Sequence, residues 1–148
     1  MSSFQKVTPY LWFEKNTLVA AEFYCSLFDD SQILSASPMI VEFELQGTNF
    51  MALNGGPQFK FNEAVSFFIT CDDQEEVDHF WNNLTANGGE ESMCGWCRDR
   101  FGLWWQVVPQ RFIDLMQSGE PDRVKRVTDA MLKMKKMVIA DLEAAHNG

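Results

Sequence analysis

The sequence is poor in histidine and in positive charge. It contains 2 histidines, and its 12 lysines and arginines are outnumbered by 21 aspartates and glutamates, which gives a net charge of −9. Phosphate contacts require clustered basic side chains, so this balance excludes a general nucleic-acid binder. The basic residues that do cluster, Lys133, Lys135 and Lys136, lie in a segment predicted to be helical, where they indicate a solvated face.

Long apolar runs are also absent. No segment approaches the roughly 20 apolar residues of a membrane-spanning helix, and the first six residues lack the apolar core of a signal peptide. We therefore expect a cytoplasmic protein with no membrane contact. With 46% hydrophobic and 14% aromatic residues among 148, the chain is able to form one compact domain with a substantial core.

Cysteine is scarce as well, with four residues: Cys25, Cys71, Cys94 and Cys97. Without an export signal they indicate reduced thiols rather than a disulfide framework. Cys94 and Cys97 form a C-x-x-C pair, but a zinc site would need two further ligands at similar spacing, and a thioredoxin-like pair should open a helix. We interpret all four as ordinary cysteines.

What the chain does contain is aromatic, strand-like sequence, above all in residues 95–109. Two strand-favouring runs separated by the turn at 99–102 predict a β-hairpin. Its second arm, residues 103–108, stops at Pro109, which cannot donate to a ladder. The single polar residue of this arm, Gln106, either satisfies buried backbone or points at a bound molecule, because an unpartnered buried polar group is costly.

The same order of elements occurs twice. Phe13 aligns with Thr70 and Asn16 with Asp73 at an offset of 57 residues, and Gly47 answers Gly102 at an offset of 55. This self-similarity predicts two βαβββ units. The expected strands are 7–13, 32–36, 40–46, 47–54, 64–70, 90–93, 96–100 and 103–108, with one helix after Asn16 and another from residue 72 or 73 to about 86.

A helical tail follows the repeat. It comprises residues 110–117 and a helix opened by Pro121, which carries one apolar stripe made of Val124, Val127, Met131, Met134, Val138 and Leu142. Packing explains a Met-containing stripe more readily than a ligand box. On a terminal helix, the covered surface belongs either to the same domain or to a second subunit.

Four segments, residues 8–13, 50–56, 71–78 and 99–109, resemble the PhnB-like branch of the vicinal oxygen chelate superfamily, which is often labelled 3-demethylubiquinone-9 3-methyltransferase. The resemblance extends over nearly the whole chain and includes 130–136. It implies an α+β fold in which two βαβββ modules form a curved mixed sheet around a small-molecule cavity, and usually a homodimer. We expect one glyoxalase/bleomycin-resistance-like domain over 1–148, with modules at about 7–56 and 64–109 and a tail at 110–148.

One connection departs from the pattern of this family. Residues 36–40 form a shorter link than the glycine-rich loop expected between these strands. Either a mobile loop is missing from the sequence or the protein is trimmed here. A missing loop would be able to cover the cavity and supply residues to it.

Metal-dependent relatives hold a divalent cation with His and Glu side chains from four strands, which leaves positions open for substrate oxygens. The matching positions here are Pro9, Ser66, Gln106 and either Met51 or Asn54. These residue types are poor ligands, and we expect surface or satisfied-core roles for His79 and His146. The sequence therefore predicts neither the ancestral metal site nor another cofactor.

Three functions stay open, and the first is the binding of a small hydrophobic or planar molecule. Period-two alternation predicts which side chains share the pleat of Pro9, Ser66 and Gln106. The candidate cavity residues are Leu11, Phe13, Ser66, Phe68, Thr70, Trp104 and Gln106, with Val108 at the end of the strand. Alternatively, the same aromatics simply fill the core.

The second function is an enzyme of the vicinal oxygen chelate type: a lyase, an isomerase, a dioxygenase or the methyltransferase of the family label. Its candidates for proton or covalent chemistry are poor, because Glu42 and Glu44 are predicted to face solvent, Asp99 to shape the turn, and Cys71 has no assignable base. No glycine-rich strand-to-helix loop offers a methyl-donor site. The third function is a dimeric interaction module that acts through the Met-bearing C-terminal helix.

Overall fold

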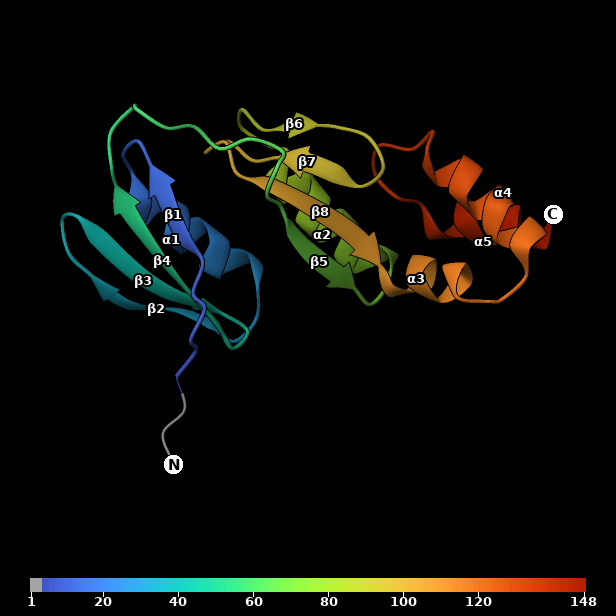
Figure 1. The fold of residues 1–148 in the computed structure, drawn as a ribbon, viewed down its shortest axis with the longest axis horizontal. Coiled ribbons are helices and arrows are strands. Elements are labelled where there is room, and N and C mark those ends of the chain that lie inside the picture. Colours follow the sequence, from blue (N-terminus) through green and yellow to red (C-terminus); the bar gives the residue numbers. More distant parts are fainter. Residues whose placement is uncertain (1–3) are drawn as a thin grey trace. The chain divides into compact units, whose positions relative to one another are not determined.

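The computed structural model describes residues 4–148 (Figure 1). Its contacts divide the chain into a first unit that ends at Phe61 and a second that begins at Asn62. The signal-peptide expectation rests partly on residues 1–3, which lie outside the described residues. None of the described helices is long and apolar enough to cross a membrane.

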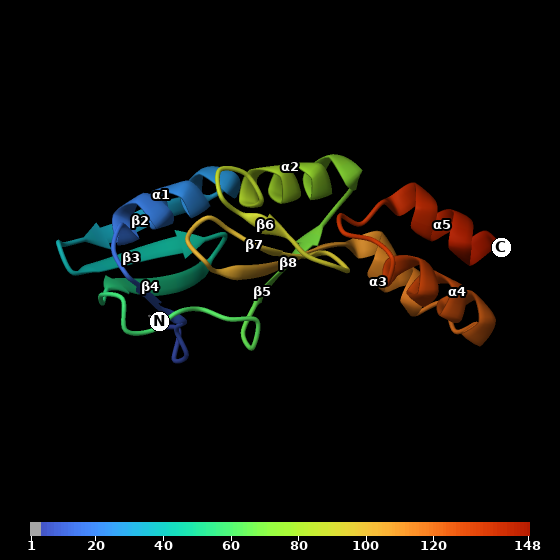
Figure 2. The same cartoon turned by 90° about the horizontal axis from the view of Figure 1, so that it is seen from above.

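The first unit is one βαβββ module. It consists of β1 (Tyr10–Phe13), α1 (Thr17–Leu27), β2 (Ser31–Ala36), β3 (Ile40–Leu45) and β4 (Thr48–Asn54). The strand order is β1-β4-β3-β2, in which β1 and β4 are parallel and the other neighbours antiparallel. Helix α1 covers one face of this sheet (Figure 2).

Alternation along β3 decides which face of this sheet is covered. Val41, Phe43 and Leu45 are buried, and the glutamates between them are partly exposed. The Phe43 ring stacks on Phe50 of β4 at 5.1 Å and lies 6.1 Å from Tyr24 of α1. The half-exposed strand predicted from the sequence is therefore confirmed, with its apolar side under the helix.

The link between β2 and β3 is a tight, hydrogen-bonded turn. The backbone N of Ser37 donates to the carbonyl of Ile40 at 2.9 Å, and the N of Ile40 donates to Ser37 Oγ at 3.1 Å. Asn54 donates its side-chain Nδ2 to the carbonyl of Pro38 at 3.0 Å. The chain is therefore closely bonded at the point where the resemblance implies a longer loop.

The second unit repeats the module. It contains β5 (Phe67–Cys71), α2 (Gln74–Leu84), β6 (Glu90–Glu91), β7 (Trp96–Arg98) and β8 (Trp104–Pro109), in the strand order β5-β8-β7-β6 with β5 and β8 parallel. The Asp73 carboxylate caps α2 by accepting a hydrogen bond from the N of Glu76 at 2.9 Å. Together the units confirm the predicted α+β fold with two βαβββ modules, and neither mixed sheet closes on itself.

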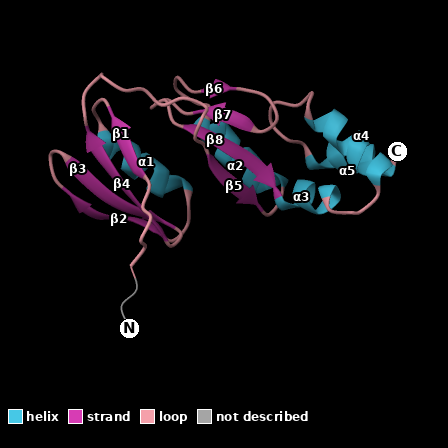
Figure 3. Cartoon of the chain, in the orientation of Figure 1, coloured by secondary structure: helices cyan, strands magenta, loops and turns pink. Residues whose placement is uncertain are grey.

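Three helices end the second unit: α3 (Gln110–Met116), α4 (Pro121–Met131) and α5 (Ile139–Asn147) (Figure 3). With the end of β8 they bury an apolar cluster made of Val108, Leu115, Val127, Met137 and Leu142, against which Met116, Met131 and Met134 pack. The Met-bearing stripe therefore covers a surface of its own unit.

The prediction of one continuous helix after Pro121 is wrong. Helix α4 stops at Met131, and residues 132–138, which we call the tail connection, run beside the second module. The carbonyls of Met134 and Lys135 accept hydrogen bonds from the backbone N of Cys94 at 2.7 Å and of Gly95 at 2.9 Å. These partners from a distant turn replace those of a longer helix, so the lysine cluster lies in a connection rather than on a helical face.

Gln74 fixes the other end of the tail connection. Its Nε2 donates to the carbonyl of Met137 at 3.0 Å, and its Oε1 accepts from the N of Ile139 at 2.8 Å. Lys136 pairs with Asp78 at 3.1 Å. The hydrogen bond from Gln74, followed by the one from Lys136, lowers the pKa of the Asp78 carboxyl.

We predict that Gly95→Ala destabilises the second unit through this contact. At Gly95, with φ +82°, an added Cβ would lie 2.8 Å from the carbonyl oxygen of Val107 and 3.2 Å from Cε of Met137. Strain and displacement of the tail connection should lower the free energy of unfolding by about 2–3 kcal/mol in urea titrations. Gly119 has the same φ with nothing within 4 Å of an added Cβ, so Gly119→Ala should cost about 1 kcal/mol. Equal losses in the two variants would contradict the close packing.

Candidate functional site

A buried carboxylate builds the turn between β7 and β8. Asp99 is 0% exposed. Its Oδ1 accepts hydrogen bonds from the backbone N of Phe101 at 2.8 Å and of Leu103 at 3.1 Å, and its Oδ2 accepts one from Trp105 Nε1 at 2.9 Å. The predicted role of Asp99 in shaping the turn is therefore confirmed, and the same side chain also orients the indole of Trp105.

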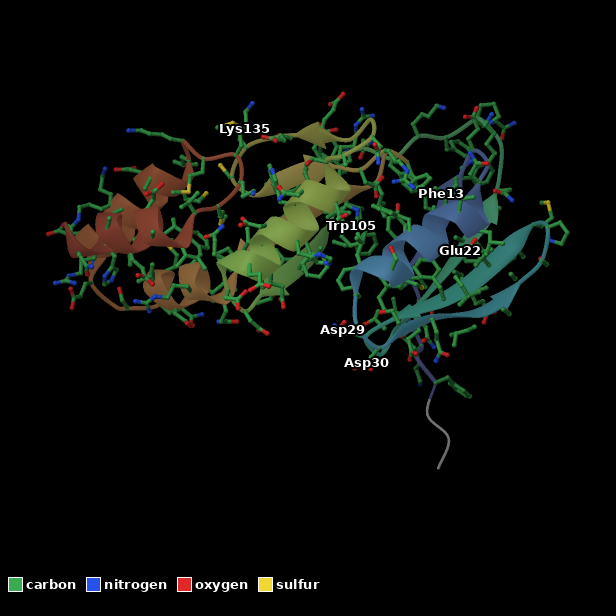
Figure 4. The ribbon with its side chains drawn as sticks, turned by 180° about the vertical axis from the view of Figure 1, so that it is seen from behind. Phe13, Glu22, Asp29, Asp30, Trp105 and Lys135 are labelled. Carbon is green, nitrogen blue, oxygen red and sulfur yellow. The ribbon has the colours of Figure 1, made fainter. Side chains whose placement is uncertain are left out.

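The orientation of Trp105 decides which residues of β8 face outward. Trp105 and Val107 are buried in the sheet that α2 covers, and Trp105 is labelled in Figure 4. Because side chains alternate along a strand, Trp104 and Gln106 point to the opposite face. We call this face, opposite α2, the open face of the second sheet.

Gln106 lies at the centre of the open face. The strand register places it between Phe68 of β5 and Trp96 of β7. Its Nε2 donates to Ser66 Oγ at 2.9 Å, which leaves the amide oxygen as an acceptor. The sequence left two roles open for Gln106. Among residues 4–148 its amide bonds to the Ser66 hydroxyl and not to a buried backbone group.

The open face combines aromatic and polar side chains. Phe68 is 51% exposed, Thr70 is exposed, and Trp104 is partly exposed. Val108 has the same orientation, but the helical tail covers it. The structure therefore brings five of the predicted site residues to one face: Ser66, Phe68, Thr70, Trp104 and Gln106.

The structure places Leu11 and Phe13, the two predicted site residues of the first module, in its core. They are 6% and 3% exposed, and the Phe13 ring, labelled in Figure 4, lies 6.5 Å from that of Tyr24 on α1. Alternation of side chains along β1 was expected to turn both residues toward a ligand, but α1 covers the face of the sheet on which they lie. For β1 the assignment is therefore corrected: Leu11 and Phe13 pack beneath α1.

Tyr10 and Trp12 occupy the other face of β1. Trp12 is held in place, because its Nε1 donates to the carbonyl of Gly56 at 2.9 Å and its ring lies 4.9 Å from that of Phe59. A Cβ at Gly55 would overlap this indole, at 2.3 Å from the nearest ring carbon. Sequence reasoning missed Trp12, although Gly55, which makes room for the indole, belongs to a glycine pair that was visible as a chain break.

The positions matching the ancestral metal ligands offer a poor donor set. Pro9 has no donor atom in its side chain, Met51 has only a thioether, and Ser66 and Gln106 bind each other. The side-chain oxygen of Asn54 already accepts a hydrogen bond from the backbone N of Thr17 at the start of α1. Over residues 4–148 no group of three His, Cys, Asp or Glu could hold a metal ion. These residues do not fit the cation that the resemblance implies.

The buried cysteines are poor nucleophiles. Cys71 and Cys97 are both 0% exposed, and burial raises the pKa of each thiol to about 12. All four cysteines are free. Because the thiolate is the reactive form, Cys71 stays protonated and unreactive at neutral pH.

Two βαβββ modules, each with a helix on one sheet face, define a protein of the vicinal oxygen chelate class. Within it, the model of the family described as 3-demethylubiquinone-9 3-methyltransferase matches residues 5–108. The chain belongs to this family. The match ends before the helical tail, so it does not include the segment 130–136 that the sequence resemblance was expected to cover.

Solved structures share this fold. The PhnB protein from Bacillus cereus, which carries the same family name, is 30% identical with a TM-score of 0.66, and the match covers 71% of this chain and 99% of that one. A glyoxalase-related enzyme from Fulvimarina pelagi is 13% identical with a TM-score of 0.51, covering 71% and 88%. The fosfomycin resistance protein FosX from Listeria monocytogenes is also 13% identical with a TM-score of 0.51, covering 70% and 88%. No curated protein matches the chain.

We predict two classes of thiol. Cys25 and Cys94, which are partly exposed, should react with a disulfide reagent in the folded protein at pH 8, and Cys71 and Cys97 only after unfolding. Folding raises the pKa of the buried pair from 9.0 to about 12. The stability that they contribute is therefore complete below about pH 9 and declines as the pH rises toward 12. Mass spectrometry assigns the labelled sites, and rapid native labelling of Cys71 or Cys97 would contradict this account.

Proposed function

We propose that the open face of the second sheet binds a small hydrophobic or planar molecule. The observation that supports this most is the position of Gln106, an amide held by Ser66 at 2.9 Å between Phe68 and Trp96. Aromatic side chains supply contact area for a planar ring, and a fixed amide supplies a directional hydrogen bond that orients the bound molecule. Small-molecule sites commonly combine these two features.

The exposure of the aromatic residues supports the same proposal. Phe68 is 51% exposed, so its ring leaves apolar surface in contact with water on the open face. Covering such surface is favourable by roughly 25 cal/mol per Å². We propose Ser66, Phe68, Thr70, Trp104 and Gln106 as the contacting residues, and we exclude Leu11 and Phe13 because α1 already covers them.

We propose that this binding uses no metal. FosX from Listeria monocytogenes is described in complex with Mn(II) and sulfate, but at 13% identity the likeness extends to the fold alone. In this chain the matching side chains offer a hydroxyl, an amide and a thioether. This set lacks both the carboxylate oxygens that suit Mn(II) and the imidazoles that suit Zn(II) or Fe(II).

The methyltransferase of the family name is the weaker candidate. Each sheet contains a single parallel strand pair, unlike the doubly wound parallel sheet of nucleotide-type sites. Covalent chemistry at Cys71 is disfavoured, because its thiol has a pKa of about 12 and the thiolate is the nucleophile. Lyase, isomerase and dioxygenase activity would each need a metal or a positioned base, and the five proposed contacting residues offer only neutral polar groups, at Gln106, Ser66, Thr70 and the indole of Trp104.

We also propose a cytoplasmic location, and a homodimer, which is the assembly that the resemblance implies. We propose that its interface does not use the apolar stripe of the helical tail, because Val127 and Leu142 of that stripe are already buried within their own unit. Removing the chain from Pro121 onward should therefore expose the end of β8 and destabilise the second unit. A change confined to the mass in solution, without loss of stability, would instead support the interaction-module alternative.

We predict that planar hydrophobic metabolites quench the tryptophan fluorescence of the protein, and that Gln106→Ala weakens the binding roughly three- to tenfold, as loss of one net hydrogen bond does. Gln110→Ala is the matched control, because Gln110 is exposed on α3 and its side chain donates to Asp114 at 3.0 Å, away from the open face. No quenching by any compound, or equal weakening in both variants, would count against the proposal.

Divalent metal should leave the thermal stability unchanged. A cation bound only by the folded state would raise the melting temperature by mass action, so titration with Mn²⁺, Mg²⁺ or Zn²⁺ tests the site directly. We expect no shift and no effect of a chelator. A stoichiometric ion retained through purification and detected by elemental analysis would overturn the metal-free proposal.

A further inference from the structure

We infer that the ligand of the open face is an aromatic carboxylate, whose anionic group is bound by the guanidinium of Arg98. This inference rests on the proposed function and names the class of molecule that the face selects.

Arg98 belongs to the same face as Gln106. It lies directly opposite Trp104 across the β7–β8 pair, and Trp96 lies opposite Gln106. Between Trp96 and Arg98, Cys97 is 0% exposed and points into the core, so its two neighbours point outward. Two aromatic side chains, Trp96 and Trp104, thus stand beside an amide and a guanidinium.

The guanidinium of Arg98 is incompletely satisfied. Its Nη2 donates to Glu90 at 2.8 Å, but its Nε is buried and has no hydrogen-bond partner among residues 4–148. A buried donor on a charged group is costly to leave unpaired. The side chain as a whole is 35% exposed, so rotation of its outer torsions can present the unpaired edge to a ligand.

A carboxylate is the acceptor that suits this edge. Guanidinium and carboxylate are both planar and form parallel hydrogen bonds in one plane. A carboxylate that is coplanar with an aromatic ring extends that plane over Trp96 and Trp104. The free oxygen of the Gln106 amide then accepts from a ring N–H or O–H, so a heteroaromatic or hydroxylated ring fits best.

Glu90 has a predictable effect on such a ligand. The side chain of Glu90 is 62% exposed, and a solvent-exposed ion pair such as the one it forms with Arg98 contributes little to stability. It does compete with any second anion for the same guanidinium. Neutralising Glu90 should therefore strengthen the binding of an aromatic carboxylate, whereas neutralising Arg98 should weaken it.

The test compares 2-naphthoate with its neutral amide, 2-naphthamide, by isothermal titration calorimetry on the full chain. We expect 2-naphthoate to bind about tenfold more tightly than 2-naphthamide. Arg98→Gln should abolish this preference, and Glu90→Gln should strengthen 2-naphthoate severalfold without changing 2-naphthamide. Arg111→Gln is the matched control, because Arg111 forms an exposed pair with Glu143 at 3.0 Å on the helical tail.

The outcomes separate this inference from the proposed function. Equal affinity for both probes, with Gln106→Ala weakening both, would overturn the inference but still support ligand binding on the open face. Binding of neither probe would overturn the inference and count against the function as well. Where Arg98→Gln fails to fold, Glu90→Gln decides, because it keeps Arg98, and an unchanged affinity for 2-naphthoate in that variant would overturn the inference.

Discussion

The hydrogen bonds of the Asp99 carboxylate are the interaction on which the second unit depends. One buried side chain binds the backbone of Phe101 and Leu103 and the indole of Trp105. Ionised acceptors form stronger hydrogen bonds than neutral ones, and a buried network that loses its centre leaves unpaired donors behind. Asp99 thereby fixes the turn, the register of β7 against β8, and the side of β8 that faces outward.

That orientation connects the fold to the candidate site. With Trp105 buried, Gln106 stands on the open face, where register alone brings it between Phe68 and Trp96. The bond to Ser66 then fixes the amide across the parallel pair of β5 and β8. Strand alternation and pairing position Phe68, Trp96, Trp104 and Gln106, and Ser66 directly precedes β5.

The same alternation explains what the sequence could and could not predict. Regular alternation of apolar and charged residues in β3 predicted its buried side, and the repeat predicted both modules. In β1 both sides are apolar, so nothing local distinguished Phe13 from Trp12, and only packing against α1 decides. The tail connection was missed for a related reason, since Gln74 binds it across more than 60 residues of chain, and periodicity carries no such information.

The central claim is that a small ligand binds on the open face of the second sheet. Nitrogen-labelled tryptophan indoles report on it directly, because the four tryptophans of the second unit divide by position. Trp96 and Trp104 lie on the open face, whereas Trp81 and Trp105 are buried on the α2 side. Titration with 2-naphthoate should shift the indole signals of Trp96 and Trp104 in a saturable manner and leave those of Trp81 and Trp105 nearly unchanged. Shifts confined to the buried pair, or no shift at any concentration, would contradict the account.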